Sequence, residues 1–236
     1  DVTVSRGLGD VYKRQDLGSG AGSNYRFLKS RLLNNQYWSF VDISHQSTNY
    51  FKKNIKLSSK IKKTNFKIVD VINNLEKINF NDYNLVTGSA FLDILPKTWF
   101  KNFHKLNVDT GIVYFALNYN GNFKFFPKHK DDKKILNIFN KDQKSDKGIG
   151  ELAVGPDCTE LINKVFKRTH KTYVLDSTWD VSTNYKFQIY FLNFCREIIQ
   201  KNKLNFDDWL KFRLKCIKEK NSRFILNNTD FLAIKK

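Results

Sequence analysis

Methionine is absent from the chain, and cysteine and proline are scarce, with three of each among 236 residues. Cys158, Cys195 and Cys216 lie far apart and show no metal-ligand spacing, which argues against a disulfide scaffold or a zinc module and is typical of a reducing compartment. No apolar run is long enough for a transmembrane helix, and no signal peptide opens the chain. We therefore expect a cytoplasmic protein without a bound metal and without a membrane partner. The missing methionine also indicates a fragment or a processed product.

Acidic residues are scarce: the chain has 23 Asp and Glu and 41 Lys and Arg, which gives a net charge of +18. Arginine, the usual bidentate reader of phosphates and bases, is a small minority of the basic residues. Lysine is spread along the chain and accompanies abundant Asn, Ile and Phe, as an A/T-rich coding bias would produce. We attribute the charge to this bias and keep a nucleic-acid partner as an alternative.

Short apolar runs alternate with amphipathic stretches, a pattern typical of a parallel α/β sheet. The pattern predicts a Rossmann-like, seven-stranded and mostly parallel sheet with helices on both faces. One domain spans 16–236, and the mixed segment 119–155 is an insertion that forms a substrate lid or, alternatively, a solvated loop. Strands are expected at 37–43, 65–71, 83–88, 111–118, 172–176 and 230–234, helices at 23–33, 46–56, 93–106, 131–142, 156–168, 185–201 and 206–220, and a loop or helix end at 222–226.

The residues at the position of the first strand are more polar than a buried parallel strand requires. A glycine-rich turn at 16–22 should follow a buried apolar strand, but the preceding residues VYKRQ bring Lys13 and Arg14 into it. This segment also resembles adaptor-derived sequence that contaminates metagenomic assemblies. We expect residues 1–15 to be a non-native segment that replaces the natural strand. The alternative is a genuine, edge-like strand with solvated Lys13 and Arg14.

The turn DLGSGAG carries the chemical signal of the sequence. Glycines at 18, 20 and 22 allow a tight bend whose backbone a ligand can approach, and the helix that follows offers unpaired N–H groups. Asp42 and Asp70 end the next two predicted strands, where acids can accept from a ribose and from an adenine amino group. A phosphate-binding P-loop is excluded because no G-K-[ST] follows the glycines. The dinucleotide-binding motif of dehydrogenases is G-x-G-x-x-G, and Gly22 lies one residue too early to be its third glycine.

The segments DLGSGAG, FVDIS and YNLVTGSAFLDIL together resemble class I S-adenosylmethionine-dependent methyltransferases. The later blocks DQKSDKGIGELAVGPDCTELI and NNTDFLAI look like stretches of a little-characterised bacterial subgroup of these enzymes. The resemblance implies S-adenosylmethionine as cofactor and methyl transfer as activity. It implies that Asp16, Gly18, Ser19, Gly20 and Gly22 cradle the methionine part, that Asp42 holds the ribose, that Ile43, Asp70 and Val71 surround the adenine, and that Thr87, Gly88 and Ser89 form the floor near the sulfonium.

The methyl acceptor is not fixed by these motifs, since the fold accommodates every acceptor class. We expect a small molecule, with an RNA methyltransferase or a non-catalytic nucleotide-binding protein of the same fold as alternatives. Asn118 and Tyr119, at the end of a predicted strand, are the candidate catalytic residues. His45 is the best placed of the four histidines to act as a base, and Trp179 is a candidate for the substrate cavity.

Overall fold

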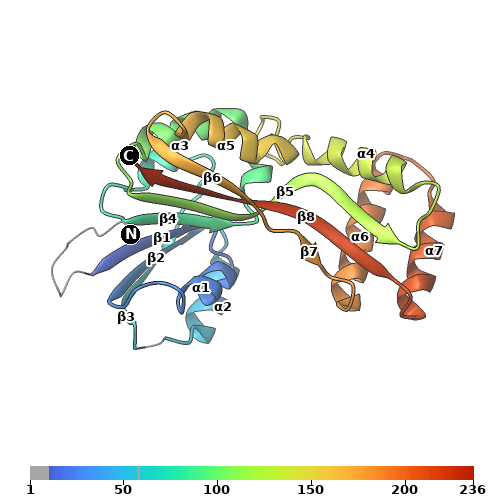
Figure 1. Ribbon diagram of the computed structural model, residues 1–236, viewed down its shortest axis with the longest axis horizontal. Coiled ribbons are helices and arrows are strands. Elements are labelled where there is room, and N and C mark those ends of the chain that lie inside the picture. The colour runs from blue at the N-terminus through green and yellow to red at the C-terminus, as the bar shows by residue number, and fades with distance from the viewer. Residues whose placement is uncertain (1–10, 58) are drawn as a thin grey trace.

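The computed structural model describes residues 11–57 and 59–236, which form one mixed sheet in the strand order β3-β2-β1-β4-β5-β8-β6, with β7 beside β8 (Figure 1). The strands are β1 Tyr12–Leu17, β2 Gln36–Asp42, β3 Ile61–Ile68, β4 Leu85–Ser89, β5 Ile112–Phe126, β6 His170–Asp176, β7 Trp179–Asp180 and β8 Arg223–Lys235. The α-helices are α1 Ser23–Leu28, α2 His45–Asn54, α3 Lys97–Leu106, α4 Asp132–Gln143, α5 Cys158–Phe166, α6 Tyr185–Lys201 and α7 Asp207–Lys218. Three short 3₁₀ helices are η1 Leu75–Lys77, η2 Leu92–Ile94 and η3 Gly155–Asp157.

The expected Rossmann-like architecture is confirmed. Strands β1 to β5 pair in parallel, and β8 runs antiparallel to β5, β6 and β7. Helices α1 and α2 cover one face and α3 and α5 the other, each over its own apolar core (Figure 1). The chain order reverses between β1 and β4, and ligands of open α/β sheets bind at such a point, beyond the carboxyl ends of the strands.

The sequence underestimated β5 and β8. Residues 223–226 of the segment expected as a loop or helix end belong to β8, and residues 119–126 of the expected lid continue β5. The two strands pair along Phe123↔Leu226 and Phe125↔Phe224, with two register shifts. Another part of the expected lid forms α4, so most of segment 119–155 is regular structure and not a solvated loop. Helix α1 also ends five residues before the expected boundary at 33, and β3 begins four residues before 65.

The long β5–β8 ribbon leaves the parallel sheet and carries a second lobe with α4, α6 and α7 (Figure 1). Its core is aromatic: the rings of Phe125 and Phe224 stack with centroids 4.2 Å apart, and Phe139 and Phe191 pack beside them. Burial of such rings removes large apolar areas from water. The composition of the chain gave no sign of this lobe, because its elements come from two separated stretches of sequence.

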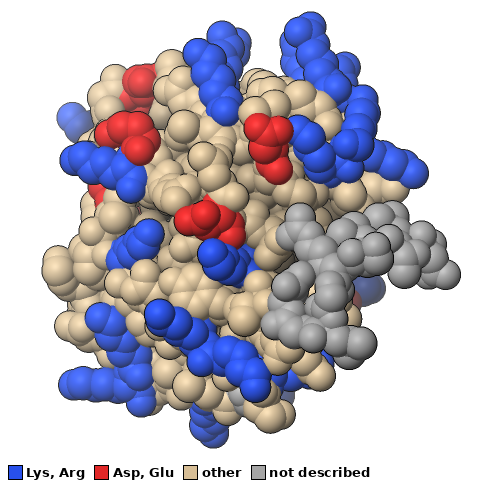
Figure 2. Space-filling view, turned by 90° about the vertical axis from the view of Figure 1, so that its left-hand side faces the viewer, with Lys and Arg blue, Asp and Glu red and all other residues tan. Residues whose placement is uncertain are grey.

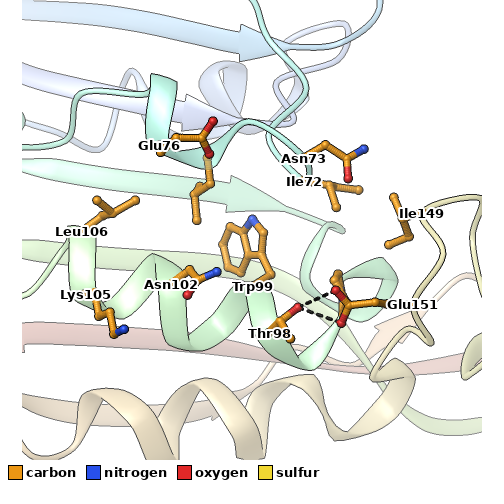
Figure 3. Close-up of a pocket in the computed structure, with 12 residues that line it drawn as sticks. Ile72, Asn73, Glu76, Thr98, Trp99, Asn102, Lys105, Leu106, Ile149 and Glu151 are labelled. Atoms are coloured by element: carbon orange, nitrogen blue, oxygen red, sulfur yellow. Dashed lines mark hydrogen bonds between the residues drawn. The ribbon is translucent and has the colours of Figure 1, made fainter.

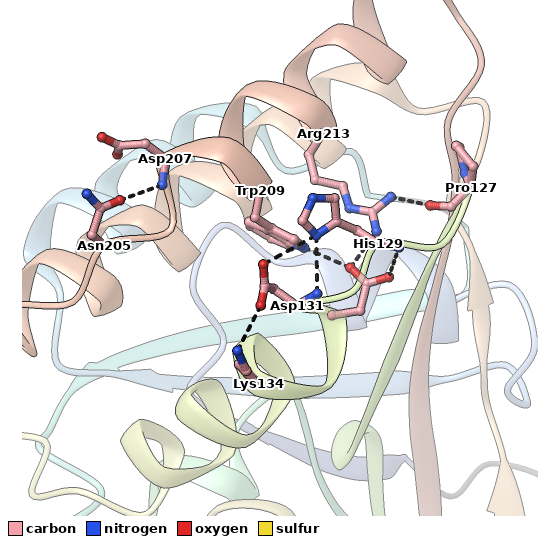
Figure 4. Close-up of polar contacts among 9 residues, drawn as sticks. Pro127, His129, Asp131, Lys134, Asn205, Asp207, Trp209 and Arg213 are labelled. Atoms are coloured by element: carbon pink, nitrogen blue, oxygen red, sulfur yellow. Dashed lines mark hydrogen bonds and ion pairs between the residues drawn. The ribbon is translucent and has the colours of Figure 1, made fainter.

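A buried ion pair fastens α7 to the first residue of α4 (Figure 4). The Arg213 side chain is fully buried; its guanidinium donates to the Asp132 carboxylate and, at 2.6 Å, to the Pro127 carbonyl. The same carboxylate accepts from Trp209 Nε1 at 2.7 Å. A buried guanidinium is tolerated only with such partners, since desolvation of a charge is costly.

The structure places β1 at the centre of the sheet, between β2 and β4, and not at an edge. Arg14 is 4% exposed: its guanidinium donates to the Tyr12 carbonyl at 2.6 Å and lies 5.9 Å from the ring centre of Trp38. Burial lowers the pKa of Arg14 to about 10. Of these two basic residues, only Lys13 is exposed to solvent. The expectation that Arg14 is also solvated was therefore wrong. Residues 1–10 lie outside the described residues, and the non-native origin of 1–15 stays a prediction.

Within the described ranges, none of the helices has the length and apolar character needed to cross a membrane. The same residues contain no group of three His, Cys, Asp or Glu side chains placed to hold a metal ion. The three cysteines are buried and free of disulfides.

We expect Asp132→Ala to lower the free energy of unfolding by about 3–5 kcal/mol, because the Arg213 charge would stay buried without its counter-charge. The matched control is Asp131→Ala, which breaks the contact to the exposed Lys134 ammonium and a longer contact, 3.7 Å, to His129 Nδ1, and should cost less than about 1 kcal/mol. Urea unfolding measures both. Equal losses for the two variants would contradict the assigned role of Asp132.

Candidate functional site

The glycine turn follows β1 at the carboxyl edge of the sheet. Gly18, Gly20 and Gly22 have φ values of +59°, +50° and +82°, a left-handed conformation that disfavours side chains. The Gly22 N–H donates to the Ser19 carbonyl at 2.8 Å, and the Ser19 N–H donates to the Val41 carbonyl of β2 at 3.1 Å. The bend is therefore closed on itself and tied to the neighbouring strand.

The surroundings of the three glycines differ. A Cβ atom at Gly22 would lie 2.2 Å from Cζ of Phe51, and one at Gly18 would lie 2.9 Å from Cδ2 of Phe91. A Cβ atom at Gly20 would meet only the Gly18 carbonyl oxygen, at 4.0 Å. Gly22 and Gly18 thus allow close packing of two aromatic rings, whereas the backbone at Gly20 is open to an approaching ligand.

Asp42 links this open backbone to the end of β2. Its Oδ2 accepts from the Gly20 N–H at 2.7 Å, and its Oδ1 accepts from the Ser44 N–H at 2.8 Å, one residue before α2 begins. Each carboxylate oxygen has a second lone pair. The oriented carboxylate can therefore also accept hydrogen bonds from a ligand's hydroxyl groups.

Asp16 lies beneath the turn and is fully buried. Its Oδ1 accepts from Asn24 Nδ2 at 2.7 Å, and its Oδ2 has no partner among the described residues. Burial raises the pKa of Asp16 to about 7, against the hydrogen bond from Asn24 and together with the nearby Asp42 charge. An unpaired buried carboxylate oxygen costs stability, and such groups occur where a ligand completes the hydrogen bonding.

The residues expected around an adenine lie at the ends of β2 and β3. Ile43 is 62% exposed beside Asp42. Burial raises the pKa of Asp70, but hydrogen bonds from Asn73 and Ile72 outweigh it and hold that pKa below its ordinary value. Val71 differs from the expectation, since its side chain is in the core and its carbonyl accepts from Trp99 Nε1 at 2.9 Å. Its role is therefore packing.

The β4 residues that were expected to form the floor near the sulfonium are also mostly buried in the core. Thr87 and Gly88 are buried, and a Cβ atom at Gly88 would lie 2.9 Å from the Phe115 ring. Thr87 Oγ1 accepts from Asn24 Nδ2 at 3.1 Å and so belongs to the Asp16 network. Only Ser89, which is half-buried, reaches the edge where a ligand would lie.

Comparison with solved structures defines the fold. A SAM-dependent methyltransferase from Methanosarcina mazei is 11% identical, with 97% of this chain and 94% of that chain covered and a TM-score of 0.53. A mycolic acid cyclopropane synthase complexed with SAH is 10% identical, with coverages of 97% and 80% and a TM-score of 0.52. The chain spans half the length of a phosphoethanolamine N-methyltransferase from Haemonchus contortus, which is 15% identical at a TM-score of 0.46, with 97% of this chain covered. No family model and no curated protein matches the sequence.

The chain has the class I methyltransferase fold. In this fold the glycine turn, Asp42, Asp16 and Ser89 all lie at the carboxyl edge of the parallel strands, beside the switch point between β1 and β4.

Two hollows of about 450 and 470 Å³ lie elsewhere on this methyltransferase fold. The first runs between η1 and α3, and Figure 3 shows Trp99 and Asn102 along it and the Thr98–Glu151 hydrogen bond at one end. The second lies between α3 and α5. Neither is lined by the glycine turn. We take the turn as the candidate site, because it brings together an open backbone, an oriented carboxylate and an unpaired buried oxygen.

Asn118 and Tyr119 lie near the same edge, on β5. Asn118 is buried, and its Nδ2 donates to the Phe115 and Thr229 carbonyls, at 3.0 and 2.9 Å. The Tyr119 hydroxyl donates to Asn140 Oδ1 at 2.8 Å, and burial raises the pKa of this phenol. A carboxamide has no readily exchanged acidic proton, and a phenol with a raised pKa stays protonated at neutral pH, so both residues are better suited to positioning a substrate than to proton transfer.

Sequence reasoning passed over Asp93, within the motif YNLVTGSAFLDIL. Asp93 lies in η2, directly beyond β4, and is half-buried. Burial raises its pKa to about 6, against the nearby Lys147 charge. The sequence offered only one hint, an acidic residue four positions after the end of a strand. An acid in an ordinary surface turn would have the same spacing.

The remaining candidates lie apart from this group. His45 is an exposed first residue of α2, and Trp179 is an exposed residue of β7 in the second lobe. His104 and His170 both contact the Thr169 hydroxyl, where α5 leads into β6. Asp146 accepts from the backbone N–H groups of residues 148–150 and so stabilises its own loop.

We expect Gly22→Ala to destabilise the fold more than Gly20→Ala. The methyl group at 22 would collide with Phe51 in a left-handed backbone and cost about 2–4 kcal/mol, whereas at 20 only the backbone strain of about 1–2 kcal/mol remains. Chemical denaturation measures both. A larger loss at Gly20 would show that the open space above it is filled in solution.

We expect Asp16→Asn to change how stability depends on pH. The pKa of Asp16 is raised in the folded chain from 3.8 to about 7, so the folded state holds this proton more tightly than the unfolded chain does. Wild-type stability should therefore fall as the pH rises from about 4 to 7, by up to about 4 kcal/mol from this group. The variant lacks the carboxyl and should lose less, as thermal unfolding at pH 5 and pH 8 would show. Asp157→Asn, at an exposed carboxylate, is the control and should follow the wild type.

Proposed function

We propose that the chain is an S-adenosylmethionine-dependent methyltransferase that acts on a small molecule. One observation carries the proposal: the open backbone of Gly20 donates to the Asp42 carboxylate at the carboxyl edge of the sheet, above the unpaired oxygen of Asp16. The methyltransferase fold and the SAH bound to the cyclopropane synthase support it.

The residues present fit this cofactor. Asp42 would accept from the ribose hydroxyls with its free lone pairs, and Gly20 would let the methionine part lie against the backbone. Asp16 Oδ2 would gain the hydrogen bond that it lacks. Ile43 and Asp70 would lie on either side of the adenine, and Ser89 would lie near the sulfonium. The remaining expected residues support the site from beneath: Gly18, Ser19, Gly22, Val71, Thr87 and Gly88.

The cofactor supplies an activated methyl group on a sulfonium, so the protein's task is to align an acceptor in line with it and to exclude water. The carboxyl edges of β4 and β5 lie next to this position. Their polar side chains Ser89, Asn118 and Tyr119 are held by the sheet and by the second lobe. The second lobe, which extends from β5 and β8, would cover the acceptor in the way that the expected lid was predicted to do.

The basic surface does not favour an RNA acceptor. Figure 2 shows many Lys and Arg side chains on the face that lies to the left in Figure 1, at the amino ends of the parallel strands. Two lysines at the amino ends of the parallel strands contact backbone carbonyl groups: Lys60 Nζ, just before β3, lies 3.1 Å from the Ser30 and Leu32 carbonyls, and Lys236 Nζ, after β8, lies 3.1 Å from that of Lys167. A polyanion bound there would lie at the opposite end of the strands from the proposed methyl donor.

Calorimetric titration with S-adenosylhomocysteine and, in parallel, NADH tests the proposal. We expect S-adenosylhomocysteine to bind and Asp42→Ala to weaken it by about 1–3 kcal/mol, through loss of charge-assisted bonds to the ribose. Asp82→Ala removes an exposed acid before β4 and should leave the affinity unchanged. Binding of NADH alone would overturn the proposal. Methyl-labelled cofactor incubated with a metabolite extract then separates an enzyme, which labels a product, from a non-catalytic binding protein, which does not.

A further inference from the structure

The turn between β4 and α3 is held at both ends. The Ala90 N–H donates to the Ala116 carbonyl of β5 at 3.0 Å, and the Leu95 carbonyl accepts from the Val154 N–H at 2.9 Å. Asp93 lies between these two anchors, in η2, which packs against β5 and α5. Asp93 therefore lies beside the carboxyl end of β4 and beside the part of β5 that pairs with β4.

Asp93 is half-buried and forms no ion pair among the described residues. The η2 turn that carries it packs against β5 and α5, and its charge contributes to the raised pKa of Tyr119 and of Cys158. Its carboxylate accepts no hydrogen bond from another of the described residues. Lys147 is the nearby basic group, but its ammonium is 3.0 Å from the Asp142 carboxylate and 2.7 Å from the Asp142 carbonyl. Asp142 therefore engages this ammonium, and Asp93 has no ion pair.

A second unsatisfied acceptor lies on the neighbouring strand. Asn118 is completely buried, its Nδ2 is fixed by two carbonyl groups, and its Oδ1 has no partner among the described residues. Rotation of the amide would lose both Nδ2 bonds, so the sheet holds the oxygen in place. Two oxygen acceptors without donors, with the Tyr119 ring nearby, are suited to a ligand rich in N–H groups and positively charged.

We propose that Asp93 and Asn118 bind the nucleophilic nitrogen of the methyl acceptor, which is a primary or secondary amine that arrives as its ammonium ion; this rests on the proposed function. Asp93 takes one proton from the ammonium, and the freed nitrogen lone pair forms the N–CH₃ bond as the S–CH₃ bond breaks and its electrons stay on sulfur. The products are the methylated ammonium, S-adenosylhomocysteine and one proton, which leaves Asp93 to solvent. An ammonium with a pKa of about 10 yields this proton far more readily than an alcohol does.

Binding of n-butylammonium and of n-butanol to the protein saturated with S-adenosylhomocysteine tests this assignment. The two probes have similar size and differ in charge. We expect the wild type to bind butylammonium and Asp93→Asn to bind it about tenfold more weakly, with an unchanged affinity for S-adenosylhomocysteine. Asp157→Asn removes the same charge from an exposed position in η3 and should bind butylammonium as the wild type does.

Equal butylammonium affinity in the wild type and Asp93→Asn would overturn the proposal, as would butanol binding as tightly as butylammonium. Absence of saturable butylammonium binding to the loaded wild type would do the same. In each of these results S-adenosylhomocysteine still binds, so the proposed function stands. Failure of S-adenosylhomocysteine itself to bind is the separate result that removes both.

Discussion

The hydrogen bond from the Gly20 N–H to the Asp42 carboxylate is the contact on which the candidate site depends. It joins the turn after β1 to the end of β2, and the Ser44 N–H holds the other carboxylate oxygen at the start of α2. The bond exists because glycine takes a left-handed conformation at 18, 20 and 22, which aims the Gly20 N–H across to the next strand. Without it, the exposed backbone and the carboxylate would have no fixed relation to each other.

Polar burial along this edge opposes stability. Asp16 and Asn118 each bury an oxygen without a partner, and Asp93 loses much of its hydration. Such groups lower the free energy of unfolding, and three of them along one sheet edge would be a poor choice for a structure selected only for stability. Aromatic cores on both faces of the sheet and in the second lobe offset this cost. The site is therefore an arrangement that the rest of the fold stabilises.

The second lobe gives the β5–β8 pair a double role. Near the parallel sheet, Asn118 and Thr229 fix the edge beside the proposed methyl donor, and farther along, Phe125 and Phe224 stack in the core under α6 and α7. Tyr119 joins the two parts, because its ring packs on Phe139 and its hydroxyl is held by Asn140 of α4. A movement of α4 relative to the sheet would therefore displace Tyr119, beside the proposed acceptor position.

Local pattern was enough to predict the glycine turn, the acids at the ends of β2 and β3, and most helices and strands, because these follow from φ preferences and side-chain periodicity over a few residues. It was not enough for the distinct roles of Gly20 and Gly22, the core position of Val71, the buried Arg14, the length of β8 or the importance of Asp93. Those depend on burial and on partners distant in sequence: Phe51 against Gly22, Trp99 against Val71 and Thr229 beside Asn118. Only the folded chain brings such residues together, so only the tertiary structure decided which polar groups found a partner and which were left for a ligand.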